Sequence, residues 1–166
     1  MTVFEKNMTV LSGRYPDLAK LVESTAVTSY QVVPSFVNLM PNLLCKTDRD
    51  EILFYDPADP LAHIRSVLTD LKLESALVIV LLGLGLGYNL KILFSALTNR
   101  GPLGKIIVVE KDLECLRLAM EMHDLSEILA NPQVKLIIGC SEEDLYVNIW
   151  NAISPEFGIL KAIKFI

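Results

Sequence analysis

The chain has 166 residues, a formal net charge of −5 and no long run of like charges, so it lacks the basic stripe that nucleic-acid binding requires. Apolar residues make up 52% of it and charged residues 21%, which excludes disorder and suits one domain with a sheet covered on both faces. The three cysteines form no CxxC or Cys/His cluster, so we expect free thiols in a reducing compartment and no metal site.

Residues 1–58 are predicted to form a small α+β lead-in. Residues 1–26 have the apolar spacing of two short helices that are separated at Pro16. Short β-like runs follow, YQVV, NLLC and EILFY, and the polar turn 47–50 between the last two predicts a hairpin. The first six residues already include charged side chains, so no signal peptide is expected.

A helix of about 12 residues is predicted next, with Asp59 as its N-cap and Pro60 at its first position. We interpret Asp56-Pro57 and Asp59-Pro60 as turn and cap chemistry, with an acid–base role as the alternative. His63 lies in the first turn of this helix, where an exposed or locally paired imidazole is the first interpretation and a catalytic one the second.

Residues 59–166 are predicted to form a Rossmann-like α/β domain. The expected elements are strand 76–82, glycine turn 83–87, helix 88–98, strand 105–109, a helix from about 113 and strand 134–138. Asp112 can cap the helix from 113, and Asp124 with Glu127 forms a capping-box pattern. Strands rich in Val, Ile and Leu and linked by helices predict a mostly parallel sheet in a three-layer sandwich. The stretch after residue 153 leaves room for one more strand, so we expect a small sheet or one truncated at the C-terminus.

The most apolar stretch, residues 75–90, has 16 residues without a charge, which is too short for a membrane span, and it is broken by three glycines, so we expect a cytoplasmic protein with no membrane partner. Those glycines, Gly83, Gly85 and Gly87, follow a predicted strand directly. Glycine there lets the backbone approach a ligand, and the next helix presents N–H groups to it. The dinucleotide-binding fingerprint G-x-G-x-x-G needs a third glycine at the position of Tyr88, so binding of NAD is disfavoured. A tight corner that needs small residues only for packing is the alternative.

The GLGLG sequence is similar to motif I of S-adenosylmethionine-dependent methyltransferases, which implies that cofactor. Glu110 stands where those enzymes place the acid that binds the ribose hydroxyls, although a solvated acid or a helix cap explains it equally. Two positions depart from the family pattern: Leu81 replaces the acid before the glycines, and Cys140 replaces an aspartate. With His63 and His123 as the only histidines, no catalytic set can be assembled and the catalytic residues stay unassigned.

Three short motifs together resemble the N-terminal region of the motility-associated factor (Maf) glycosyltransferase family. They are Y-D-P before a helix (Tyr55–Pro57), G-x-G-L-G-Y after the first strand (Gly83–Tyr88) and V-x-E-x-D after the second (Val108–Asp112). The resemblance implies a link to flagellin or surface glycosylation, in which members transfer a nonulosonic acid from a CMP-sugar to serine or threonine. In that family the transfer is associated with a downstream domain, which we expect to lie outside these 166 residues.

We therefore expect a binding or docking module without a complete catalytic site, and a methyltransferase-like enzyme is the alternative. The candidate ligand is S-adenosylmethionine or a nucleotide-sugar. The candidate binding residues are Gly83, Gly85, Gly87 and Tyr88, with Glu110 opposite as an acceptor for ribose or sugar hydroxyls and Asp112 as an auxiliary. The expected partners are a downstream glycosyltransferase domain or a second copy of the chain.

Overall fold

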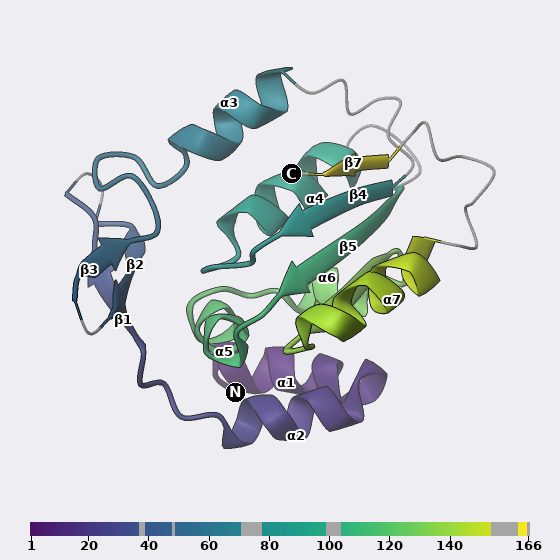
Figure 1. Cartoon of the computed structure of the whole chain (residues 1–166). Helices are drawn as coiled ribbons and strands as arrows, with labels where there is room; N and C mark the ends of the chain where they lie inside the picture. The colour runs from purple at the N-terminus through teal and green to yellow at the C-terminus, as the bar shows by residue number, and fades with distance from the viewer. Residues whose placement is uncertain (37–38, 48, 71–77, 99–103, 154–162, 166) are drawn as a thin grey trace.

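The computed structural model describes residues 1–36, 39–47, 49–70, 78–98, 104–153 and 163–165. Within them the chain forms two sheets and the helices around them (Figure 1). The helices are α1 (Val3–Arg14), α2 (Pro16–Ser24), α3 (Ala62–Asp70), α4 (Tyr88–Thr98), α5 (Leu113–Met122), α6 (Ser126–Ala130) and α7 (Glu142–Ile153). The strands are β1 (Tyr30–Pro34), β2 (Pro41–Lys46), β3 (Glu51–Leu53), β4 (Val78–Leu82), β5 (Lys105–Glu110), β6 (Val134–Ile138) and β7 (Ile163–Phe165).

The larger sheet is parallel throughout, in the order β6-β5-β4-β7. Alternate residues of its strands face opposite sides, as the pleat requires. Ile79 and Ile106 belong to the buried cluster that also holds residues of α4, α5 and α6, whereas Val78 and Ile107 pack with Ile153 of α7. This arrangement is the predicted three-layer, Rossmann-like α/β sandwich, and β7 supplies the one further strand that the C-terminal stretch allowed for.

The two N-terminal helices complete one of the outer layers. Thr2 and Glu5 form a capping box at the start of α1, and α2 begins at Pro16 as predicted. Leu11 and Val22 are fully buried in the cluster that covers the α5 side of the sheet, and Figure 1 shows α1 and α2 next to α5. The helices of the predicted lead-in therefore share a core with the Rossmann-like part, and a domain division at residue 58 stays a prediction.

The smaller sheet is antiparallel, in the order β1-β2-β3, and contains the predicted β2–β3 hairpin. Its buried face rests on a cluster in which Leu43 meets Leu86, Tyr88 and Cys115. Since Leu86 and Tyr88 belong to the glycine turn and the start of α4, this contact seats the small sheet directly against the glycine turn.

Local differences from the sequence predictions have simple causes. The helix expected from Pro60 begins at Ala62, because Asp59 accepts the N–H of Leu61 through its side chain and that of Ala62 through its carbonyl. The capping box predicted for Asp124 and Glu127 is wrong: α6 has Leu125 at its cap position without a side-chain cap. The start of the strand predicted at 76 and the loop 99–103 lie outside the described residues. No described helix is long and apolar enough to cross a membrane.

Candidate functional site

The glycine turn between β4 and α4 adopts the conformation that its sequence predicts. Gly83, Gly85 and Gly87 have φ angles of 86°, 53° and 82°, in the left-handed region that side chains other than glycine rarely adopt. The turn therefore needs its glycines for backbone geometry, whether or not a ligand binds there.

The N–H groups of the turn all find acceptors within the chain. The N–H of Leu84 donates to Glu110 Oε2 at 2.7 Å, and that of Gly85 reaches the same oxygen at 3.4 Å. The N–H of Leu86 donates to the hydroxyl of Tyr55 at 2.6 Å. The remaining two donate to backbone carbonyls, Gly83 to Val109 and Gly87 to Leu84, each at 2.8 Å. In this conformation the turn presents no N–H group to the phosphate of a ligand.

Glu110 closes the turn from the end of β5. Its side chain is buried, and its second oxygen accepts the N–H of Asp112 at 2.9 Å. Both carboxylate oxygens are therefore engaged by backbone N–H groups, which are strong partners for a charged acceptor. The geometry places Glu110 beside the glycine turn, as predicted, and directs it into that turn.

Tyr55 closes the turn from the small-sheet side. A Cβ atom on Gly85 would lie 2.2 Å from the Tyr55 hydroxyl, so the two residues fit together only because Gly85 has no side chain. Burial raises the pKa of Tyr55 to about 12, against the opposing effect of the Leu86 N–H, so the phenol stays protonated at neutral pH. The Y-D-P, G-x-G-L-G-Y and V-x-E-x-D motifs thus meet at one point, through Tyr55, the glycine turn and Glu110.

Tyr88 and Asp112 connect the same region to the small sheet. Tyr88 is buried, donates its hydroxyl to the carbonyl of Pro41 at 2.8 Å, and packs edge to face on Tyr55. Asp112 caps α5 as predicted, by accepting the N–H of Glu114 at 2.9 Å, and also accepts the hydroxyl of Tyr30 at 2.9 Å. Both predicted site residues therefore have partners within the chain that hold the small sheet to the sandwich.

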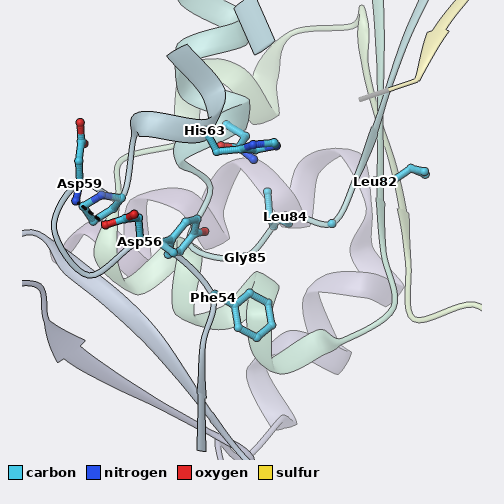
Figure 2. A pocket seen from close by; sticks show the side chains of 11 residues that line it. Phe54, Asp56, Asp59, His63, Leu82, Leu84 and Gly85 are labelled. Carbon is cyan, nitrogen blue, oxygen red and sulfur yellow. Dashed lines mark hydrogen bonds between the residues drawn. The ribbon is translucent and has the colours of Figure 1, made fainter. Parts of the chain in front are cut away.

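A pocket with a volume of about 280 Å³ lies beside the glycine turn (Figure 2). In that view the turn at Leu84 and Gly85 lies between His63 and Phe54. The residues that line it are Phe54, Tyr55, Asp56, Asp59, Pro60, His63, Leu82, Gly83, Leu84, Gly85 and Asn89. Of the six predicted site residues only Gly83 and Gly85 line this pocket; Gly87, Tyr88, Glu110 and Asp112 do not.

The polar side of the pocket, formed by Asp56, Asp59 and His63, is not among the site residues predicted from the sequence. The local sequence pattern favours turn, cap and surface roles for Asp56, Asp59 and His63. The structure shows these local roles as well, because Asp56 accepts the N–H groups of Ala58 and Asp59. The signal that could have found them is the Y-D-P motif, since it recurs together with the glycine turn in the family that the sequence resembles.

The described residues contain no group of three or more His, Cys, Asp or Glu side chains that could hold a metal ion. Cys45, Cys115 and Cys140 are free thiols, and burial raises the pKa of Cys115 to about 12, so this thiol stays protonated. Neither observation assigns a catalytic group, and the catalytic residues remain unassigned.

The fold and this corner define a Rossmann-like α/β domain in which the glycine turn is closed by side chains of the chain itself. A family model described as the glycosyltransferase Maf N-terminal domain matches residues 59–157. The chain belongs to this family.

One solved structure, a Maf glycosyltransferase from Magnetospirillum magneticum AMB-1, is similar to the chain with a TM-score of 0.68 and 16% sequence identity. The similarity covers 91% of this chain and 29% of that one, so the chain spans less than a third of the solved protein. At this identity the likeness concerns the fold alone. No curated protein matches the chain significantly.

Proposed function

We propose that the chain is a docking module of a Maf-type glycosyltransferase, which holds other parts of the enzyme and does not supply its catalytic centre. The observation that carries this proposal is the closed glycine turn. Its N–H groups, which a cofactor-binding corner would offer to a ligand, hold Glu110 and Tyr55. The three family motifs then fix the small sheet against the sandwich. The region is therefore rigid, as a docking surface needs to be.

Exposed apolar side chains next to this rigid region support docking. Phe36 is 85% exposed and Leu39 is 76% exposed, both in the turn between β1 and β2. The backbone of Phe36 is tied to the segment that precedes α3, because its N–H donates to the carbonyl of Pro57 at 2.9 Å. Large apolar side chains that a folded chain holds in water are typical of a surface that another protein covers.

The occupant that we propose for this surface is the remainder of a Maf-type glycosyltransferase, since the solved relative is more than three times as long as its matching part. The sequence resemblance supports an enzyme that transfers a nonulosonic acid from a CMP-sugar in flagellin or surface glycosylation. The free cysteines fit a reducing compartment, and we propose that the chain acts in the cytoplasm.

The test mixes the chain with a Maf-type glycosyltransferase whose own N-terminal domain has been deleted, and measures association by sedimentation velocity and calorimetry. We expect a one-to-one complex. Replacing both Phe36 and Leu39 by Ser should weaken it at least about tenfold, since buried apolar anchors carry most interface energy.

The matched control is Leu21→Ser on α2, where an exposed apolar side chain lies on another element. This variant should bind like the unaltered chain. Absence of any complex, or self-association of the chain in its place, would contradict docking to the transferase.

A further inference from the structure

The pocket beside the glycine turn lies where open α/β sheets bind their ligands. In the order β6-β5-β4-β7, the chain builds outward from β4 on one side through β5 and β6 and then returns to pair β7 on the other. The strand order therefore reverses at β4, and ligands bind outside the carboxyl ends of the strands at such a point. Leu82, the last residue of β4, and Gly83, which follows it, line the pocket.

The charges on the pocket wall select against anions. Asp56 and Asp59 both line it, and its described lining contains no lysine or arginine. Arg65 pairs with Asp59 at 2.6 Å but is not part of the lining. Because the N–H groups of the glycine turn are engaged by Glu110 and Tyr55, a phosphate would meet carboxylates here without the backbone donors that commonly bind it.

The same wall suits a flat ring with hydroxyl groups attached. The side chain of Phe54 is half exposed and lines the pocket, so a planar base can stack on its ring. Asp56 Oδ1 accepts two backbone N–H groups, and no described residue hydrogen-bonds the second oxygen, which can accept ligand hydroxyls. Asn89 adds an amide that both donates and accepts, as a base edge requires. A volume of about 280 Å³ lies just below the range of drug-sized sites, about 300–1,000 Å³, and fits one such group.

We propose that this pocket binds the nucleoside group of a ligand without its phosphate, with the base against Phe54 and the ribose hydroxyls donated to Asp56. The proposal goes beyond docking and is independent of it, since Phe36 and Leu39 do not line the pocket. The nucleoside can be free, or it can be the adenosyl group of a thioether such as S-adenosylhomocysteine, which carries no phosphate either.

The test titrates the full chain with adenosine, cytidine, their 5′-monophosphates and S-adenosylhomocysteine, by calorimetry and by backbone amide chemical shifts. We expect saturable binding of a nucleoside or of S-adenosylhomocysteine, with shift changes at Gly83, Gly85 and His63. The corresponding monophosphate should bind at least about tenfold more weakly because of its repulsion by the two aspartates.

Asp56→Asn keeps the oxygen that accepts the N–H groups of Ala58 and Asp59, so the variant should fold. The substitution should weaken nucleoside binding about tenfold. It should also narrow the difference in affinity between the nucleoside and its monophosphate. The matched control is Asp50→Asn, an exposed aspartate in the β2–β3 turn, which should change neither. Monophosphates that bind as tightly as nucleosides, or no nucleoside binding by the folded chain, would overturn the proposal, and the docking assay would be unaffected in either case.

Discussion

Two corners of the parallel sheet follow the same plan and are closed in different ways. The β4–α4 corner is held by Glu110 and Tyr55, which lie 26 and 31 residues away from the N–H groups they bind. The β6–α7 corner also has a left-handed glycine, Gly139, but its helix is capped locally, with the N–H of Asp144 donating to Ser141 Oγ at 3.1 Å. A glycine-rich corner can therefore be shaped by distant side chains of the same chain, and its glycines alone do not establish a ligand site.

The largest expected effect comes from Gly85→Ala at the first corner. The new Cβ would lie 2.2 Å from the Tyr55 hydroxyl at a φ of 53°, so the variant combines a clash with backbone strain. We expect a loss of roughly 3–4 kcal/mol in the free energy of unfolding, measured by denaturant titration.

Gly139→Ala is the matched control at the second corner. Its Cβ would meet Leu113 at 3.5 Å, an ordinary contact, so only the left-handed φ of 66° is penalised, at about 1 kcal/mol. Tyr55→Phe removes the hydroxyl, so Gly85→Ala should lower the free energy of unfolding less in this background than in the unaltered chain. A double-mutant cycle measures the difference. Equal losses at the two corners would show that Tyr55 does not restrict the first one.

A smaller effect is expected from Glu110→Gln. The amide keeps one acceptor oxygen but turns an NH₂ donor toward a backbone N–H group of the turn or of Asp112, so about 2 kcal/mol of stability should be lost. Glu143→Gln, at an exposed position of α7, should leave the melting temperature unchanged. If Glu110→Gln melts like the unaltered chain but loses nucleoside binding, Glu110 serves a ligand and not the turn.

The smallest effect concerns pH. Burial, and then the charge of Lys91, lower the pKa of His123 to about 4, and its ring packs on Tyr88 at 4.8 Å between centroids. A histidine with a depressed pKa contributes stability above its unfolded pKa of about 6.5, and this is lost as pH falls toward 4. With solvent screening of a half-buried ring, we expect a loss of roughly 1 kcal/mol over that interval.

Unfolding curves between pH 7 and pH 4 measure this dependence. In His123→Phe, which keeps an aromatic contact with Tyr88 and cannot take up a proton, most of the loss over this interval should disappear. His63→Gln replaces an exposed histidine and should keep the dependence of the unaltered chain. The same slope in His123→Phe as in the unaltered chain would assign the acid sensitivity to other groups.

Local patterns predicted most of the secondary structure. The strand, glycine turn and helix around Gly83–Gly87 follow from an apolar run, three glycines and a helical period, and α5 with its Asp112 cap was predicted at its observed position. The capping box of Asp124 failed because α6 starts one residue later than the pattern assumed, so that Asp124 binds the N–H of Ser126 from outside the helix.

The candidate site was harder to predict, because it depends on contacts between segments. Nothing local indicates that the Tyr55 hydroxyl fits over Gly85, since this requires the small sheet to pack on the start of α4. The pocket likewise forms only when the segment from Phe54 to His63 lies across the end of β4. The motifs could be located in the sequence, but their mutual contact could not.

The contacts of the N-terminal helices determine when these helices can dock during synthesis. Asn7 of α1 is fully buried and donates to the carbonyls of Met120 and His123, 113 and 116 residues further on. Arg14 donates to the carbonyls of Asn131 and Val134, 117 and 120 residues away. As the chain leaves the ribosome, α1 must wait until these carbonyls, more than a hundred residues further on, have been made before it can dock. During translation the apolar sides of α1 and α2 stay exposed, and a chaperone that holds nascent chains would find its binding surface there.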